Sequence, residues 1–547
     1  MKRLIVFLVV PLLSACASIP TTSQLHVLDE VQNSPGSDRV RVIARPPAKS
    51  MSPQELIDGY IAAQASTADN FAIAREYLSS KLSQAWHPTS VHIIDGPATQ
   101  FISLSASDTR VATSELGVLA ESSRLTWWNK PETSTDVFAV ESTPDGYRLS
   151  RVPNKIYMSA LDFARSYVST PLYFLNPSYS SLVPEFVWLP NDAAVATNVT
   201  QLLLRGPDGY LKNALQTAIP TGTKIAPSAV TVAGGEASVN LDARALKVTD
   251  AQRTAMAAQI TWTLTALSRV NSVRVTAANQ AISTEKFVFS RNDFSALSPD
   301  QMAIARPLFS VSGSRLVRGV AAKPDDVGQL ASAQVISLSG DGAQLAYVTS
   351  GDAYIAPVTA PAAGTRLLGG VVDIDFDASN RLWMVTANGR LWVRDGVRPP
   401  QKVLSVPEDQ RVVAISHSPD GARVAIVFAS DGGQSVRICG VVTTGTSVAL
   451  GPAIRVEQSL SGALDVAWLD SLQLLIVGQL GVEQPSVFRL NLQAFQTTPL
   501  GGPAGIAQLS AVYGQPPAVL TNQGMVWILQ GTQWQSLREA SAIAYAA

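Results

Sequence analysis

The chain has 547 residues with 41 basic and 42 acidic side chains, so its formal net charge is −1. A balanced charge argues against a nucleic-acid partner, and the length predicts two to four domains. Two cysteines and four histidines are too few for a disulfide framework or for a zinc site of several thiolates. We therefore predict no metal and no cofactor.

The first sixteen residues predict an export signal followed by a lipid anchor. Lys2 and Arg3 precede an uncharged apolar stretch, residues 4–13, which is too short to span a bilayer comfortably. Leu13-Ser14-Ala15-Cys16 then matches the bacterial lipobox at every position. A thioether to diacylglycerol forms only on a thiol, and two or three acyl chains anchor a protein stably.

We therefore predict that residues 1–15 are a lipoprotein signal peptide and that Cys16 is lipidated, with S-diacylglycerol and an N-acyl (palmitate-type) chain. This places the chain on the extracytoplasmic face of the cell membrane. An ordinary signal peptide that ends in Ala-Cys is the alternative.

A linker rich in Pro, Ser and Thr, residues 16–50, precedes the first globular region, residues 51–155. This region opens on Ser52-Pro53-Gln54-Glu55, which supplies the N-cap, the first-turn proline and the glutamate of a capping box. Apolar spacing predicts a helix after this box and one further helix over residues 71–82. Short strand-like runs follow. Helices before a curled sheet predict an α+β fold similar to the cone-shaped nuclear-transport-factor-two type.

The second region, residues 156–295, predicts the element order β-α-β-β-α-β. Strands at residues 229–232 and 237–240 are expected to form a hairpin through Gly234-Gly235. The run Thr249-Asp250-Ala251-Gln252 is a capping box for the second helix. A strand at residues 186–189 is expected to join the others in a single open sheet, with both helices on one face.

The third region, residues 300–547, lacks long amphipathic helices. Short apolar strands alternate with turns of Gly, Asp, Asn and Ser, and similar strand pairs recur at intervals of about 40 to 50 residues, which is the period of four-stranded propeller blades. The pairs cover residues 335–349, 374–386, 414–428, 464–477 and 507–521. The sequence predicts a C-terminal β-propeller. It leaves five and six blades open, because strands at residues 308–311 and 316–320 would supply a sixth.

No catalytic motif stands out. The run Asp373-Ile374-Asp375-Phe376-Asp377 resembles a calcium loop, but an EF-hand needs Gly and Glu where Ala378 and Met384 stand, so a strand with one wet face is favoured. Ser283 and Lys286 match Ser-x-x-Lys without the companion motifs of penicillin-binding proteins. The chain also has no Gly-x-Ser-x-Gly elbow. We predict that it is not an enzyme and that it has no catalytic residues.

Aromatic residues leave two uses open. The tryptophans of the third region would pack in blade cores or line a glycan groove, and their aliphatic neighbours favour the core. They are Trp383, Trp392, Trp468, Trp527 and Trp534. Trp127 and Trp128 are adjacent in a strand and face opposite ways, so one of them is expected to be exposed or to line a cavity. Cys439 lies among apolar residues and is expected to be a buried strand residue.

Several short motifs occur in a characteristic order along the chain. They are Leu13-Ser14-Ala15-Cys16, Ala44-Arg45-Pro46-Pro47 before the first helix, Asn191-Asp192, Leu202-Leu203-Leu204-Arg205-Gly206-Pro207, Val239-Asn240-Leu241 and Ser418-Pro419-Asp420-Gly421. This order of parts resembles the LpqB family of actinobacterial lipoproteins over essentially the whole chain. The middle region then resembles the GerMN module of sporulation and germination proteins.

The resemblance implies a non-enzymatic protein that is accessory to a two-component system of the Mtr type. Its partner would be the extracellular domain of the sensor kinase MtrB, and the process would be cell-envelope homeostasis and division. Only Cys16 carries over as a modified residue. A protein that binds cell-wall glycan is the alternative, and a hydrolase with an unrecognised site is the least favoured one.

Overall fold

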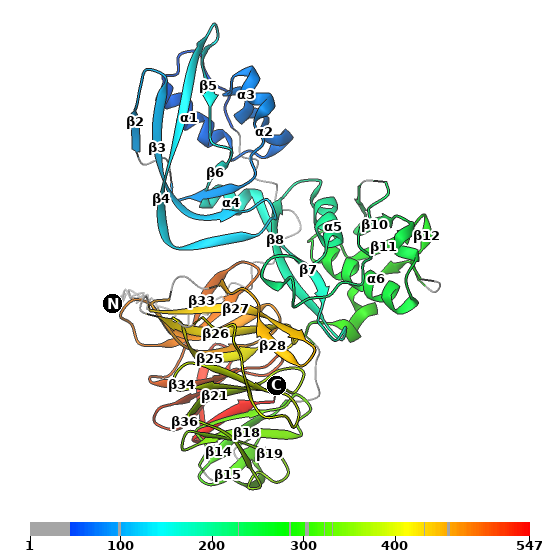
Figure 1. The fold of residues 1–547 in the computed structure, drawn as a ribbon, viewed down its shortest axis with the longest axis vertical. Helices are drawn as coiled ribbons and strands as arrows, with labels where there is room; N and C mark the ends of the chain where they lie inside the picture. Colours follow the sequence, from blue (N-terminus) through cyan, green and yellow to red (C-terminus); the bar gives the residue numbers. More distant parts are fainter. Residues whose placement is uncertain are drawn as a thin grey trace, which may run out of the picture. The chain divides into compact units, whose positions relative to one another are not determined.

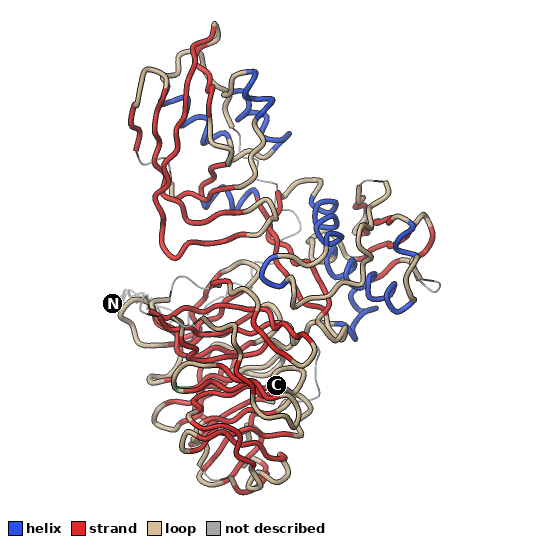
Figure 2. The backbone as a smooth tube through the Cα atoms, in the orientation of Figure 1, coloured by secondary structure: helices blue, strands red, loops and turns tan. Residues whose placement is uncertain are grey.

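The computed structural model describes residues 44–96, 100–227, 229–283, 286–300, 306–321, 323–330, 332–407, 409–430, 433–456 and 460–546. The predicted signal peptide, Cys16 and most of the linker lie outside these residues. Three regions of regular structure follow one another along the chain (Figure 1), and mixed helix and strand give way to strands alone in the third (Figure 2). No helix among the described residues is long and apolar enough to cross a membrane.

The first region joins helices to a six-stranded sheet. Helix α1 begins as predicted, because the Ser52 side chain accepts a hydrogen bond from the Glu55 N–H while the Glu55 carboxylate accepts one from the Ser52 N–H at 2.8 Å. The sheet has the order β5-β4-β3-β1-β6, with β2 paired to β3. The bounds are α1 Pro53–Ala63, α2 Ala68–Glu76, α3 Ser80–Ala85, β1 Val91–Ile94, β2 Gln100–Ser103, β3 Asp108–Leu119, β4 Leu125–Thr143, β5 Gly146–Arg151, β6 Ile156–Ser159 and α4 Ala160–Ser166.

The single helix predicted over residues 71–82 is wrong, because the chain forms α2 and α3 with a break between them. The Leu149 N–H of β5 donates to the Tyr77 carbonyl at 2.9 Å, and the Ser79 N–H donates to the Leu149 carbonyl at 2.8 Å. Backbone groups bonded to a strand cannot also serve a helical ladder. The break therefore belongs to the contact with the sheet.

The second region has two sheets, so the single open sheet that we predicted is wrong. The predicted strand at residues 186–189 lies in β8, and within the described residues β8 pairs with β7 alone. Helix α6 holds this hairpin, since Thr263 Oγ1 accepts from the Tyr173 N–H at 2.9 Å and Gln259 Nε2 donates to the Tyr173 carbonyl at 3.1 Å. The predicted hairpin through Gly234-Gly235 and the Thr249 capping box are confirmed.

The main sheet of this region has the order β12-β11-β10-β9, with β13 on β11 and with β10 and β11 parallel. The bounds are β7 Tyr167–Leu175, β8 Leu182–Pro190, α5 Val195–Arg205, β9 Thr231–Ala233, β10 Glu236–Leu241, α6 Asp250–Leu264, β11 Ser272–Ala277, β12 Gln280–Ala281 and β13 Val288–Phe289, with 3-10 helices at Gly209–Leu211, Ala243–Leu246 and Arg291–Leu297.

The third region is a β-propeller. Its described residues form six sheets, or blades, each with a first, second, third and fourth strand from the centre outwards. Blade 2 comprises β17 Val335–Leu338, β18 Gln344–Thr349, β19 Asp352–Pro357 and β20 Thr365–Gly369. Blade 3 comprises β21 Val371–Phe376, β22 Leu382–Thr386, β23 Leu391–Arg394 and β24 Gln401–Lys402. Blade 4 comprises β25 Arg411–His417, β26 Arg423–Ser430, β27 Gly433–Thr444 and β28 Ser447–Leu450, with β29 Ile454–Arg455 on β27.

The remaining blades show how the ring closes. Blade 1 takes its first strand from the C-terminus, because β38 pairs antiparallel with β14 through contacts such as Leu308 with Tyr545. Blade 1 comprises β38 Ala542–Tyr545, β14 Leu308–Ser312, β15 Arg315–Arg318 and β16 Asp325–Gln329. Blade 5 comprises β30 Gly462–Trp468, β31 Gln473–Gln479, β32 Ser486–Asn491 and β33 Gln496–Gly501, and blade 6 comprises β34 Ile506–Ser510, β35 Ala518–Thr521, β36 Met525–Gln530 and β37 Gln533–Glu539.

Candidate functional site

The propeller has a central channel, a cavity of about 550 Å³ that is lined by residues from the first strands of all six blades. These first strands are β38, β17, β21, β25, β30 and β34, and each contacts the next around the ring. A channel built from several blades offers polar side chains from segments far apart in the sequence. We therefore take it as the candidate site.

One row of channel side chains joins four of the six first strands to the next one. We call it the second row, because its positions lie two residues further along each strand than those of a first row, which is described below. Each member accepts a hydrogen bond from a backbone N–H of the following blade. The pairs are Ser337 with Phe376 at 3.1 Å, Asp375 with His417 at 2.7 Å, Ser416 with Trp468 at 3.3 Å and Ser510 with Tyr545 at 2.9 Å.

The first row comprises Asp373, Asp465 and Gln508. The Asp373 carboxylate accepts from the Ile415 N–H at 3.0 Å, and the Asp465 carboxylate accepts from the Leu509 N–H at 2.7 Å. The Gln508 side-chain oxygen accepts from the Ile543 N–H at 3.2 Å. Strand-to-strand bonds of this kind fix the spacing of neighbouring blades around the channel.

Each first-row aspartate also uses its other oxygen. Asp373 Oδ1 accepts from the N–H of Ile374 at 2.9 Å, and Asp465 Oδ1 accepts from that of Val466 at 2.8 Å. The equivalent position on β25 is Ala414, which has no acceptor to offer Val466. The Asp465 carboxylate therefore accepts the N–H of Val466 on its own strand, because the preceding blade has no acceptor for it.

Burial dominates the electrostatics of the first row. It raises the pKa of the Asp465 carboxyl to about 7, although two N–H donors oppose the shift. The pKa of Asp373 is raised well above its ordinary value, first by burial and then by the charges of Asp465 and Asp375, and its own N–H donors oppose this. The charge of Asp375 therefore raises the pKa of both carboxyls, and the charge of Asp465 adds to the shift of Asp373.

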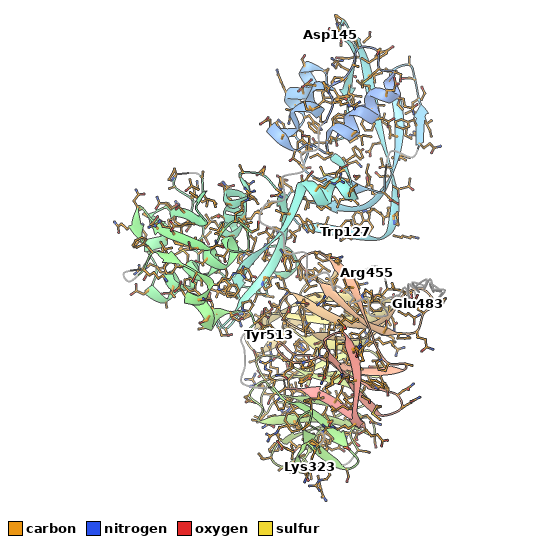
Figure 3. All side chains as sticks on the ribbon, turned by 180° about the vertical axis from the view of Figure 1, so that it is seen from behind. Trp127, Asp145, Lys323, Arg455, Glu483 and Tyr513 are labelled. Carbon is orange, nitrogen blue, oxygen red and sulfur yellow. The ribbon has the colours of Figure 1, made fainter. Side chains whose placement is uncertain are left out.

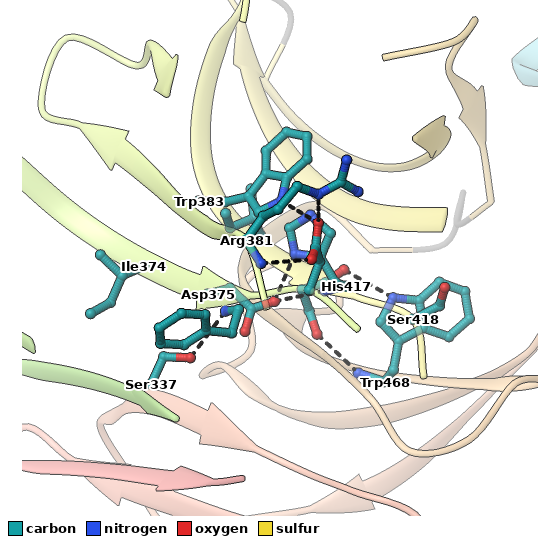
Figure 4. Close-up of polar contacts among 12 residues, drawn as sticks. Ser337, Ile374, Asp375, Arg381, Trp383, His417, Ser418 and Trp468 are labelled. Atoms are coloured by element: carbon teal, nitrogen blue, oxygen red, sulfur yellow. Dashed lines mark hydrogen bonds and ion pairs between the residues drawn. The ribbon is translucent and has the colours of Figure 1, made fainter. Parts of the chain in front are cut away.

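A polar cluster surrounds the second row on blades 3 and 4 (Figure 4). The His417 ring nitrogen Nδ1 lies 3.0 Å from Asp375 Oδ2, and the ring packs against Trp383 with centroids 4.7 Å apart. Trp383 Nε1 and Arg381 Nε both donate to Asp377 Oδ2, at 2.9 and 2.6 Å. This cluster holds the turn between β21 and β22 in place.

The alternating run from Asp373 to Asp377 is therefore used within the fold. The prediction of a strand is confirmed, because β21 spans Val371–Phe376 and its carboxylates accept backbone N–H groups. Across the part of the chain that the structure describes, no three His, Cys, Asp or Glu side chains are placed to hold a metal ion.

The other residues singled out in the sequence do not gather at the channel. Cys16 lies outside the described residues. Cys439 is buried in β27, as predicted, and burial raises the pKa of its thiol to about 12. Lys286 pairs with Asp293 at 2.7 Å, so its ammonium group is already occupied by a carboxylate.

The tryptophans pack rather than protrude. Trp383 and Trp468 are buried, and Trp392, Trp527 and Trp534 are half-buried, which favours the core over a glycan groove. Trp127 and Trp128 on β4 are both half-buried, so neither is fully exposed, and Trp127 (Figure 3) packs on the core of the first region.

Sequence reasoning missed the two rows as a set. Asp373 was read only as part of a calcium-like run, and Asp465, Gln508 and Ser510 were not singled out. The available signal was the repeat itself, since these residues stand at matching places before the turn of each copy. Their role still depends on a strand about 40 residues further on, which a single repeat does not reveal.

The fold and the channel define a multidomain protein in which two α+β regions precede a propeller. Three family models match: "Lipoprotein LpqB, N-terminal domain" over residues 46–164, "Sporulation and spore germination" over residues 171–283 and "Lipoprotein LpqB beta-propeller domain" over residues 375–545. The chain belongs to the LpqB lipoprotein family.

Relatives match over nearly the whole length. Lipoprotein LpqB of Streptomyces coelicolor is 24% identical over 612 residues, and that of Streptomyces avermitilis is 25% identical over 604 residues. Each alignment covers 98% of this chain and 96% of the relative. Among solved structures, TolB from Acinetobacter baumannii is similar with a TM-score of 0.37 and 13% identity, over 55% of this chain and 86% of that one.

Proposed function

We propose that this chain is a membrane-anchored extracytoplasmic lipoprotein that binds another envelope protein and catalyses no reaction. The observation that carries the proposal is the lipobox Leu13-Ser14-Ala15-Cys16, which stands at the start of a chain from a family of lipoproteins. The thiol of Cys16 would carry the S-diacylglycerol, and the new amino group would carry the N-acyl chain. A tether of this kind raises the effective concentration of the protein for partners in the same membrane.

The use of the channel side chains supports a binding role. Asp373 and Asp465 each accept two backbone N–H groups, and Asp375 accepts the His417 N–H and lies beside its ring. Side chains with these bonds are held in fixed positions in the ring, which suits them to contact a ligand. A scaffold with many exposed loops and a fixed centre suits recognition.

The anchor is tested by a Cys16→Ala variant, with Cys439→Ala as the matched control because it removes the other cysteine. We expect the Cys16→Ala protein to leave the membrane fraction after export while the Cys439→Ala protein stays. Mass spectrometry of the N-terminal peptide should find the lipid on Cys16. A Cys16→Ala protein that is cleaved after residue 15 and still sediments with membranes would refute lipid anchoring.

The resemblance favours the extracellular domain of an MtrB-type sensor kinase as the partner, with a role in envelope homeostasis and division. Crosslinking on intact cells followed by purification of the tethered chain tests this directly. We expect the kinase among the crosslinked proteins and an altered kinase response in the Cys16→Ala strain. Recovery of other envelope proteins without the kinase contradicts the kinase assignment, and retention of the purified chain on insoluble peptidoglycan favours a glycan ligand instead.

A further inference from the structure

Four first strands of the propeller carry an extra residue at the same place. The pairing with the second strand shifts between Val371 and Asp373 on β21, and matching shifts occur on β25, β30 and β34. The residues left unpaired are Val372, Val413, Leu464 and Ala507. A β-bulge re-aims a side chain and is a built feature of a strand. We call these four residues the bulge ring.

The bulge ring is apolar and open to solvent at the channel. All four members line the cavity. Val372 is 47% exposed and Leu464 is 43% exposed, while Ala507 is exposed and Val413 is half-buried. Apolar side chains brought together from four blades and left uncovered are typical of an interaction surface.

Carboxylates lie directly beyond this ring. Asp373 follows Val372 in the chain, and Asp465 follows Leu464, so in each case the apolar residue and the acid are neighbours along the backbone, one step of about 3.3 Å apart. Both residues are half-buried and line the cavity. Neither forms an ion pair with any residue that the structure describes. A carboxylate has about four acceptor positions, and two on each are taken by N–H groups, so both can accept further donors.

We propose that the bulge ring and the carboxylates of Asp373 and Asp465 form a docking site for a partner-protein segment that inserts one lysine or arginine side chain, flanked by apolar residues, into the propeller channel. The aliphatic stem of such a side chain packs on Val372 and Leu464, and its charged end meets the two carboxylates. This inference rests on the proposed function as a protein-binding lipoprotein and names the surface that it uses.

The two carboxylates make the docking depend on pH. A cation beside the two carboxylates favours their charged forms, so binding releases protons and the affinity increases from pH 6 to pH 8. The other ionisable residues that line the cavity are Arg306, Asp341, Asp375, His417, Tyr513 and Tyr545. His417 pairs with Asp375 of the second row.

The test uses the purified full chain and a fluorescein-labelled peptide, Gly-Leu-Lys-Val-Gly, with a matched peptide in which norleucine replaces lysine. Norleucine keeps the stem and removes the charge. We expect the lysine peptide to bind at pH 8 at least about tenfold more tightly than the norleucine peptide, as measured by fluorescence anisotropy, and to bind more weakly at pH 6. Equal binding of the two peptides, or no binding of the lysine peptide, would overturn the proposal.

Protein variants locate the site. We expect the double variant Val372→Ser, Leu464→Ser to lose about tenfold in affinity for the lysine peptide. The control Val397→Ser changes a side chain that is 95% exposed and does not line the cavity, so its affinity should not change. An equal loss in both variants contradicts docking at the bulge ring.

Failure here and failure of the proposed function are distinguishable. If the peptides do not bind while the tethered chain still crosslinks to an envelope protein, the partner docks elsewhere and only this site is refuted. If the peptides bind as expected while the Cys16→Ala protein stays on the membrane, the site stands and the anchor is refuted.

Discussion

Breaking the buried ion pair between Asp420 and Arg423 is expected to destabilise the propeller strongly. Both side chains have 0% exposure. Arg423 Nε donates to Asp420 Oδ2 at 3.1 Å, and its Nη2 donates to the same oxygen and, at 2.8 Å, to the Ser471 carbonyl of the next blade. Its guanidinium lies 4.6 Å from the centre of the Trp468 ring. The pair therefore joins blade 4 to blade 5.

Replacing Asp420 with alanine leaves a buried guanidinium without its counter-charge. Removing one partner of a buried pair costs about 3 to 5 kcal/mol, because the remaining charge stays desolvated. Asp420 Oδ1 also accepts from Ser418 Oγ at 2.6 Å and from the Ala422 N–H at 3.0 Å. These turn bonds are lost as well, so we expect Asp420→Ala at the upper end of that range.

Guanidinium chloride unfolding of the full chain, followed by tryptophan fluorescence and circular dichroism, measures the change. The control is Asp395→Ala, because Asp395 pairs with Arg398 where both side chains are about half exposed, at 49% and 51%. Such a surface pair contributes about 0 to 1 kcal/mol. We also expect Arg423→Met to rescue part of the loss in Asp420→Ala, since the unpaired charge is then gone.

Two results would refute this reasoning. One is a loss of less than about 1 kcal/mol in the free energy of unfolding of Asp420→Ala, which would mean that the site rehydrates. The other is an additive double variant, which would mean that the two side chains do not interact.

Three further predictions test the channel and the strands around it. The folded-state pKa of Asp465 is about 7 and lies above its unfolded value, so the stabilising effect of its protonated form is full at low pH and is lost between about pH 4 and pH 7. We expect Asp465→Asn to flatten this part of the plot of unfolding free energy against pH. Equal slopes in both proteins would contradict the pKa shift. A Cβ on Gly389, whose φ is +73°, would lie 2.5 Å from Arg411 Cβ, whereas a Cβ on Gly396, whose φ is +57°, meets open space. Gly389→Ala should therefore destabilise the protein by more than the about 1 kcal/mol expected of Gly396→Ala. Equal unfolding midpoints for the two variants would be evidence against the clash. In a Cys16→Ala chain, the thiol of Cys439 should react with maleimide only after unfolding, and rapid labelling of Cys439 in the native chain would show that β27 opens.

Local signals in the sequence predicted the elements that depend on a few neighbouring residues. The capping box at Ser52 works within one turn, and the hairpin at Gly234-Gly235 needs φ of +59° and +82°, which glycine adopts readily. The strand pairs of the propeller were predicted for the same reason, since each pair and its turn fall within about 15 residues.

Elements defined by distant partners were not predictable in this way. The break at Tyr77 exists because Leu149 of β5 bonds to the backbone there. The hairpin of β7 and β8 separates from the main sheet because Gln259 and Thr263 of α6 bond to Tyr173. Helix periodicity carries no information about either contact, so the sequence favoured one continuous helix and one continuous sheet.

The channel rows also explain how the last strand is received. Blade 6 supplies acceptors to β38, because Gln508 accepts the Ile543 N–H and Ser510 accepts the Tyr545 N–H. The matching positions on β38 are Ala542 and Ala544, whose side chains have no acceptor for a backbone N–H of blade 2. The closing strand is thus fixed from one side by side chains and from the other by its pairing with β14.

The proposed docking site depends on this closure. The bulge ring comes from β21, β25, β30 and β34, and its geometry exists only when the first strands stand at their spacing around the channel. Any ligand that binds only the closed ring stabilises that ring by mass action. A partner held at the bulge ring would therefore stabilise the β38–β14 pairing, even though none of the four bulge residues lies on either strand.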